Sequence, residues 1–212
     1  MQTQPWFSTP VYVNDVHENE DSYNALQEEL LSCCNNEKFS QVPGWGPDTH
    51  ELNEDPFTDN VIKNCPKFLD FLDANLMSYL DDIRCVFPRE YIITSSWFTK
   101  TLHNKYAHLH DHGSCDVSGV YYLKTNGKDG NLVFQDPYKS HATNYIYQAV
   151  TWNDPTLPLE QGLIALWPGL VQHRTQPNET QDERISLSFN LSFVRKYDDK
   201  SIRIGKANRK IL

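Results

Sequence analysis

Three histidines stand at alternate positions in the stretch 108–112, His-Leu-His-Asp-His, which limits what the chain can fold into more than any other feature. In an extended strand alternate side chains point to the same face, so all three imidazoles can face one side. Burying them together without a ligand would leave ring nitrogens unsatisfied, and neutral imidazole is the commonest protein ligand for a transition metal. The stretch therefore indicates a metal site, with a solvated edge carrying histidines as the alternative.

A distant histidine completes the predicted site. His173 follows an apolar strand and a Pro-Gly turn, which place it at a strand end facing a cavity. Ligands from two separate strands give the facial arrangement of non-haem iron enzymes, whose usual set is two histidines and a carboxylate. Here the carboxylate is missing, because a pleated strand points Asp111 away from its two neighbours. The candidates on the shared face are His108, His110 and His112.

Arg184 opens the next predicted strand, and Ser186 shares its face. A guanidinium gives two parallel hydrogen bonds to a carboxylate, and a hydroxyl two positions away can add a third. An arginine that points into a barrel needs an anion, which is either a ligand or an internal Asp or Glu. Ser188 and Asn190 continue the polar face, as expected of a strand that lines a polar ligand pocket.

The apolar pattern changes from a helical to an alternating period near Tyr91. Helical spacing predicts two helices, one starting at Asp21 or Ser22 and ending near Asn35, the other starting at Pro66. Residues 40–58, rich in proline and glycine, are expected to form a long loop. Alternation and turn residues predict the strands 6–13, 91–102, 106–112, 117–124, 130–135, 144–150, 162–167 and 184–195. This pattern favours a mainly β fold, an eight-stranded double-sheet jelly roll with both helices on one outer face.

Composition restricts the class of protein further. With 212 residues, 39% of them hydrophobic, the chain can bury a core as one domain. A net charge of −9 argues against general nucleic-acid binding, which needs a basic surface. The five cysteines are odd in number and include no CxxC pair, which favours reduced thiols in a cytoplasm. No apolar run suggests a secretion signal or a membrane span.

Several segments, in their order and spacing, resemble the 2-oxoglutarate and Fe(II)-dependent oxygenase family common in tailed phages and marine bacteria, which is related to the prolyl hydroxylases. The resemblance covers roughly residues 6–194. The segments that carry it are the start 7–12, Gly44-Trp45, 110–114, 118–123, 130–137, Trp167-Pro168 with His173, and 184–190.

The resemblance implies a double-stranded β-helix that binds iron, 2-oxoglutarate and dioxygen. The family's His-x-His-Pro pattern is matched by His110 and His112, with Gly113 in place of the proline. It therefore implies His110, His112 and His173 as the metal ligands. His108 is the second choice as a ligand, or else contacts the substrate or supports the site. The absent carboxylate leaves the third ligand open among His112, His108 and a carboxylate.

The resemblance also implies a cosubstrate site. Arg184 and Ser186 match the family's Arg-x-Ser for the far carboxylate of 2-oxoglutarate, and Tyr122 corresponds to a tyrosine that reaches the same carboxylate in prolyl hydroxylases. Further candidates for contact with the substrate or support of the site are Trp45, Trp97, Tyr121 and Asn190.

The expected function is that of a dioxygenase that hydroxylates a peptide, an amino acid or a small metabolite and yields succinate and CO2. The alternatives are a cupin-like, metal-dependent sugar isomerase or epimerase, and a non-catalytic binding module with a vestigial pocket. We expect one domain, with an N-terminal part at about 6–88, a β core at about 90–195 and a basic tail at 196–212. We expect it in the cytoplasm (of the host, if phage-encoded), without nucleic-acid or membrane partners; a homodimer is compatible with the sequence.

Overall fold

The structure, a computed structural model, describes residues 9–15, 20–42, 48–53, 60–86, 90–135, 154–194 and 209–211. The elements in these ranges are β1 (Tyr12–Asn14), α1 (Glu20–Asn35), β2 (Phe39–Gln41), β3 (Glu51–Asn53), η1 (Val61–Asn64), α2 (Pro66–Asp82), β4 (Tyr91–Thr101), β5 (Val117–Lys124), β6 (Leu132–Phe134), β7 (Thr156–Leu157), β8 (Ile164–Pro168), β9 (His173–Thr175), β10 (Arg184–Phe193) and β11 (Arg209–Ile211).

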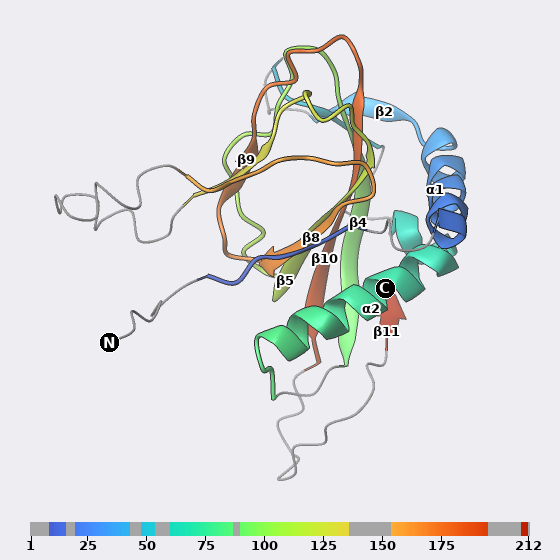
Figure 1. Cartoon of the computed structure of the whole chain (residues 1–212), viewed down its shortest axis with the longest axis vertical. Coiled ribbons are helices and arrows are strands. Elements are labelled where there is room, and N and C mark those ends of the chain that lie inside the picture. Colours follow the sequence, from blue (N-terminus) through green and yellow to red (C-terminus); the bar gives the residue numbers. More distant parts are fainter. Residues whose placement is uncertain are drawn as a thin grey trace, which may run out of the picture.

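Two sheets form the β part of the molecule. The large sheet has the order β1-β8-β5-β10-β4-β3-β2, with β11 pairing in parallel to β4, and the small sheet has the order β7-β6-β9. Strand β10 is central in the large sheet because it pairs antiparallel with both β4 and β5 along most of its length. Figure 1 shows the helices on one side of the large sheet and β9 on the other. The predicted double-sheet β fold with two helices on one outer face is confirmed.

The helices begin where the sequence predicts. Pro66 stands at the first position of α2, where its missing N–H removes no helical hydrogen bond. The carboxylate of Glu29 on α1 accepts the backbone N–H groups of Lys67 (3.1 Å) and Phe68 (3.0 Å), so one helix caps the other. A carboxylate at a helix N-terminus also interacts favourably with the helix dipole.

An aromatic cluster joins the helices to the sheet. The ring of Phe68 on α2 lies edge-on to Tyr121 of β5 and to Phe189 of β10, with ring centroids 5.7 Å apart in both pairs. All three side chains are buried, and burial of each stabilises the fold by about 1.5–3 kcal/mol. Gly119 on β5 leaves room for this packing, because a Cβ there would lie 2.4 Å from the Phe189 ring.

The structure differs from the predicted strands at several places. The predicted strand 106–112 was wrong, since only isolated bridges form there, at Tyr106 and at His110. The expected loop 40–58 carries the short strands β2 and β3, which extend the large sheet beyond β4. Strands β7, β9 and β11 were not predicted. Residues 144–150 and the part of the N-terminal strand before residue 9 lie outside the described residues, as does Trp45.

In the described part of the chain, neither helix has the length and apolar composition that crossing a bilayer requires.

Candidate metal and cosubstrate site

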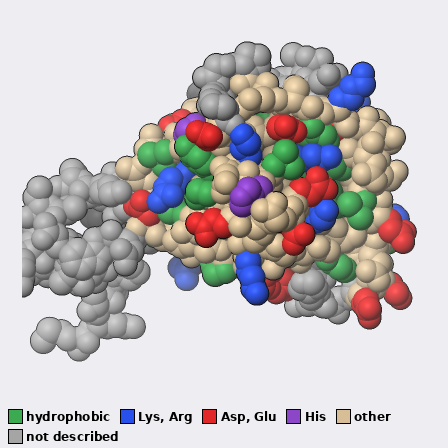
Figure 2. Space-filling model, turned by 90° about the horizontal axis from the view of Figure 1, so that it is seen from above, with side chains coloured by type: hydrophobic (Ala, Val, Ile, Leu, Met, Phe, Trp, Pro, Cys, Tyr) green, Lys and Arg blue, Asp and Glu red, His purple; other side chains and the backbone are tan. Residues whose placement is uncertain are grey.

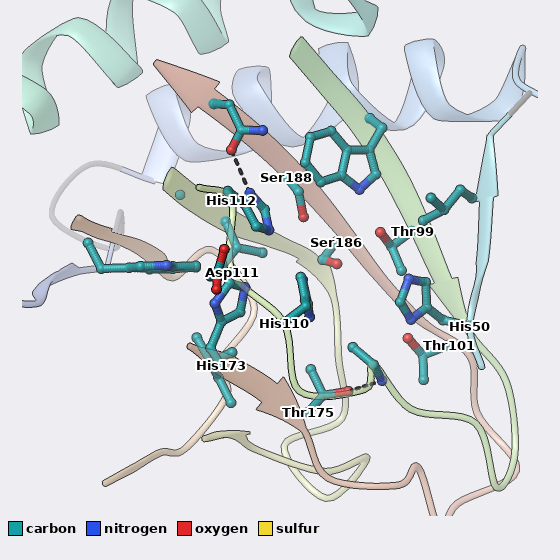
Figure 3. A pocket seen from close by; sticks show the side chains of 18 of the residues that line it. His50, Thr99, Thr101, His110, Asp111, His112, His173, Thr175, Ser186 and Ser188 are labelled. Carbon is teal, nitrogen blue, oxygen red and sulfur yellow. Dashed lines mark hydrogen bonds between the residues drawn. The ribbon is translucent and has the colours of Figure 1, made fainter. Parts of the chain in front are cut away.

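A cavity of about 340 Å³ opens on the face of the large sheet that is turned away from the helices. Its wall is made of inward side chains of β3, β4, β5 and β10, closed by residues of β6, β8 and β9 and by the loop before β5. Its volume is at the lower end of the range for small-molecule sites. Figure 3 shows His110, His112 and His173 on one side of this cavity, with Thr99 and Thr101 across from them.

His110, His112 and His173 meet at one side of the cavity, with one ring nitrogen of each within 4.8 Å of those of the other two. Backbone hydrogen bonds hold them together: the His110 N–H donates to the His173 carbonyl (3.0 Å), the His173 N–H donates to the His110 carbonyl (2.8 Å), and the His112 N–H donates to the Gly169 carbonyl (2.8 Å). The loop 107–114 is thus fixed to the connection between β8 and β9, which brings three distant imidazoles to one point.

Each of the three rings has its Nδ1 at an oxygen. The Nδ1 of His110 lies 2.7 Å from the His108 carbonyl, that of His173 lies 2.9 Å from the Val171 carbonyl, and that of His112 lies 2.6 Å from Oδ1 of Asn190. A carbonyl oxygen only accepts, so Nδ1 must be the protonated nitrogen and Nε2 carries the lone pair. This is the tautomer of a metal-ligating histidine whose other nitrogen is held by a hydrogen bond.

Burial keeps these imidazoles neutral. Desolvation lowers the pKa of His110 and His112 below its usual value, and it lowers the pKa of His173 to about 3, helped by the neighbouring His110. His173 is only 5% exposed. Near neutral pH the cluster therefore offers three uncharged nitrogen donors, the form that binds a divalent cation.

A polar group behind His112 fixes its orientation. Asn190 on β10 receives the His112 Nδ1–H and the Ser118 hydroxyl (3.2 Å), and its amide N–H donates to the Ser95 hydroxyl at 3.0 Å. The Trp97 ring lies against His112, with ring centroids 5.6 Å apart. Asn190 and Trp97 both line the cavity, as expected, and Asn190 acts on the cluster through His112.

The arginine lies on the same inner face of the large sheet. Arg184, Ser186 and Tyr122 all line the cavity, and Ser186 stands directly opposite Tyr122 in the sheet. Arg184 is 2% exposed, and burial lowers the pKa of its guanidinium. Burial likewise raises the pKa of Tyr122 well above its usual value, so its hydroxyl stays protonated and can donate.

Arg184 has no carboxylate within ion-pair distance among the described residues. Its Nη1 donates to the backbone carbonyls of Asp129 (2.6 Å) and Gly130 (3.2 Å). The Asp129 carboxylate is used elsewhere, since it accepts the Thr125 hydroxyl (2.6 Å) and the Asn126 N–H (3.2 Å). A buried cation with hydrogen-bond donors left over and a cavity beside it is a binding site for an anion.

Two other predicted residues, His108 and Tyr121, lie apart from the cluster. The ring of His108 is exposed and packs on Tyr106, and only its carbonyl serves the site. Tyr121 lies on the helix side of the sheet, where its hydroxyl accepts a hydrogen bond from Gln27 (2.7 Å), so it does not reach the cavity. Asp111 does line the cavity, contrary to expectation, because residues 106–112 form a loop without a strand's alternation.

The sequence reasoning missed one wall of the cavity. His50, Thr99 and Thr101 line it opposite the histidine cluster, and Leu52 also lines the cavity. The alternation of Thr99 and Thr101 with Trp97 on β4 was the available signal for two of them. For His50 the sequence offered no such signal, because His50 precedes a three-residue strand in a stretch expected to be a loop. Burial lowers the pKa of His50 to about 4, so it too is neutral near pH 7.

Residues 95–190 match the model of a protein family described as "Putative 2OG-Fe(II) oxygenase". The matched segment runs from β4 to β10 and contains the three clustered histidines, Arg184 and Ser186. A comparison with curated protein sequences finds no match.

Solved structures of similar fold include proteins from three bacteria. A prolyl-4-hydroxylase from Pseudomonas putida is 14% identical with a TM-score of 0.58, and the match covers 88% of this chain and 94% of that one. HygX from Streptomyces hygroscopicus, solved with nickel, 2-oxoglutarate and hygromycin B, is 15% identical with a TM-score of 0.55 (87% and 83% covered). A 2OG-Fe(II) oxygenase family oxidoreductase from Burkholderia pseudomallei is 13% identical with a TM-score of 0.56 (78% and 77% covered). At these identities the likeness shows the fold, and it confirms the expected double-stranded β-helix.

Proposed function

Because residues 95–190 match the model of a 2OG-Fe(II) oxygenase family, we propose that this protein is such an oxygenase and that His110, His112 and His173 are its iron ligands. The observation that carries this proposal is the shared tautomer of the three rings, each with its Nδ1–H given to an oxygen and its Nε2 lone pair available to a metal. Imidazole nitrogens suit Fe(II), and three of them on one side leave positions open for a cosubstrate.

The charges of the site fit this assignment. Three neutral imidazoles leave a bound Fe(II) with its full charge of two, which the 2-oxoglutarate dianion compensates. When bound, iron with 2-oxoglutarate and dioxygen supplies the oxidising chemistry that hydroxylates a C–H bond and yields succinate and CO2. Asn190 accepts the His112 Nδ1–H, which keeps the Nε2 lone pair of His112 available to the metal.

We assign the far carboxylate of 2-oxoglutarate to Arg184, Ser186 and Tyr122. Among the described residues the Asp129 and Gly130 carbonyls hold the guanidinium through Nη1, so its other N–H groups can reach a carboxylate in the cavity. The Ser186 and Tyr122 hydroxyls can each donate a further hydrogen bond. The same arginine, with no carboxylate partner in the described part of the chain, favours an oxygenase over a sugar isomerase, which has no need of it.

The substrate, in this proposal, is a small molecule with few charges. The wall opposite the histidine cluster offers the hydroxyls of Thr99 and Thr101 and the neutral imidazole of His50, and Leu52 adds an apolar side chain to the cavity lining. These groups form hydrogen bonds and apolar contacts and do not pair with a charged group. Figure 2 shows acidic and basic side chains interspersed on one face of the molecule, with a histidine exposed between them.

The test is succinate formation from 2-oxoglutarate under Fe(II) and ascorbate, first alone and then with a panel of neutral small molecules and free or peptide-bound proline. We expect turnover that a true substrate increases and that His110→Ala abolishes. His103→Ala is the matched control, because His103 is exposed and its Nδ1 contacts the Thr180 carbonyl outside the cavity. Equal succinate formation by wild type and His110→Ala would contradict the proposal.

A further inference from the structure

Two cysteines meet where α1 docks on α2, within the core cluster on the helix side of the large sheet. Cys33 lies in the last turn of α1, and Cys65 is the residue that precedes the first turn of α2. Their Sγ atoms are 2.9 Å apart. A disulfide bond is about 2.05 Å long, so the two sulfurs need to approach by less than about 1 Å to form one.

The contact is held by the structure around it. Glu29 and Cys33 stand one helical turn apart on the same face of α1, and both reach the start of α2. The Glu29 carboxylate accepts the N–H groups of Lys67 and Phe68, and the Cys65 carbonyl accepts the N–H of Leu69 at 3.0 Å. The two thiols therefore face each other as part of the helix junction.

The pair differs in accessibility. Cys33 is half-buried, whereas Cys65 is completely buried. Burial raises the pKa of the Cys65 thiol well above its usual value, so Cys65 stays protonated. An oxidant from solution therefore meets Cys33 first, and Cys65 is the thiol placed to react with the oxidised sulfur.

We propose that Cys33 and Cys65 are an oxidative modification site, which a peroxide converts to a disulfide that ties the end of α1 to the start of α2. The Cys33 thiolate takes one oxygen from hydrogen peroxide and becomes a sulfenic acid, and hydroxide leaves. The Cys65 sulfur then attacks the Cys33 sulfur; the S–S bond forms, and the sulfenic oxygen leaves as water with the Cys65 proton. Two electrons pass to the peroxide for each disulfide, and a reducing thiol reverses the step.

The disulfide closes a loop of about thirty residues and stabilises the protein chiefly by restricting the unfolded chain. For a chain of this length we expect the oxidised form to melt about 5–10 °C higher than the reduced form. The cavity lies on the opposite face of the sheet, so this site and its test do not depend on the proposed function.

The experiment uses the full chain, purified reduced, treated with hydrogen peroxide, capped with an alkylating reagent and cut with trypsin. Because no Lys or Arg precedes Lys38, one peptide, 1–38, carries both Cys33 and Cys34, and Cys65 falls in the short peptide 64–67. We expect these two peptides to be linked after oxidation and separate after reduction. Cys34→Ala should keep the link and the rise in Tm, and Cys33→Ser should lose both.

Fragmentation of the wild-type linked peptide between residues 33 and 34 gives the same answer if a variant fails to fold. A linked peptide that persists in Cys33→Ser, a link that fragmentation places on Cys34, or no linked peptide in the wild type would overturn the proposal. So would oxidation that links the peptides without a change in Tm.

Discussion

The two faces of strand β10 carry opposite chemistry. Toward the helices it presents Leu187 and Phe189, which are fully buried in the core cluster on that side of the sheet. Toward the cavity it presents Arg184, Ser186 and Asn190. Arg184 carries a buried charge, and Asn190 fixes the orientation of the His112 ring. A strand has a period of two, so one segment of chain can serve stability with one set of residues and ligand binding with the other. The comparison predicts that substitutions on the two faces have separable effects.

The largest effect is expected from a cavity residue. His173→Ala removes one of three iron ligands, and we expect turnover and iron content to fall by more than the roughly 100-fold that loss of a supporting residue typically causes. The free energy of unfolding of the metal-free protein should change by less than about 2 kcal/mol, because the substitution removes one hydrogen bond, to the Val171 carbonyl, and the contact of the ring with Trp167. Succinate assays, iron analysis and urea unfolding measure the three quantities. A metal-free variant destabilised as strongly as a core variant would break the separation.

On the helix face of β10 we expect the larger effect to be on the free energy of unfolding. Phe189→Ala should lower the free energy of unfolding by about 3–5 kcal/mol, because it leaves a cavity beside Phe68. Ser188→Ala, one residue away on the cavity face, is the matched control and should cost less than about 1 kcal/mol. Urea unfolding of the metal-free proteins compares them directly. Equal costs for the two variants would mean that the faces are not energetically distinct.

A smaller effect is expected behind the cluster. Asn190→Ala removes the acceptor of the His112 Nδ1–H and should weaken iron binding about 10- to 100-fold without abolishing it. Asn190→Asp keeps an acceptor at that position and should bind iron at least as tightly as the alanine variant. Anaerobic competition with a chelator measures both affinities. If Asn190→Ala bound iron as tightly as the wild type, Asn190 would have no role in orienting His112 for the metal.

The smallest effect is a pH dependence that belongs to the cavity side. His50 has a pKa of about 4 in the folded protein and about 6.5 when unfolded, so between these values the unfolded chain binds more protons. Stability of the metal-free protein should therefore rise with pH through this window, by up to about 1.4 kcal/mol per pH unit for this one group. His50→Gln should flatten the slope, as measured by urea unfolding from pH 4 to pH 7. An unchanged slope would contradict the assignment of a buried neutral His50.

The sequence was most informative where one residue pattern has one physical outcome. Pro66 and the apolar stripe of α2 could be placed because helical spacing and a proline start have few alternatives. The His173, Arg184 and Ser186 placements followed from strand ends and from the two-residue period, and the structure brings all three to the cavity.

The misses have physical reasons as well. The alternation in 108–112 predicted a strand, but two bridges to distant chain segments determine the conformation there, and they turn Asp111 toward the cavity and leave His108 outside. His50 could not be found, because its place depends on how β3 pairs with β4, a long-range contact without a local signal. Tyr121 and Tyr122 are neighbours of the same type, and only the register of β5 decides which one reaches the cavity.

The central claim is that the histidine cluster and Arg184 form one site for iron and 2-oxoglutarate. Anaerobic titration of the Fe(II)-loaded protein with 2-oxoglutarate, followed by the visible charge-transfer band of the complex, tests it most directly. We predict a saturable band for the wild type and a band in Arg184→Gln that needs more 2-oxoglutarate, with binding weaker by about 1.5–3 kcal/mol and an unchanged iron content. The matched control Arg174→Gln, at a half-exposed arginine of β9 that lies 4.0 Å from the Asp154 carboxylate, should titrate like the wild type. Identical titrations of the wild type and Arg184→Gln, or no band in the wild type, would contradict the claim.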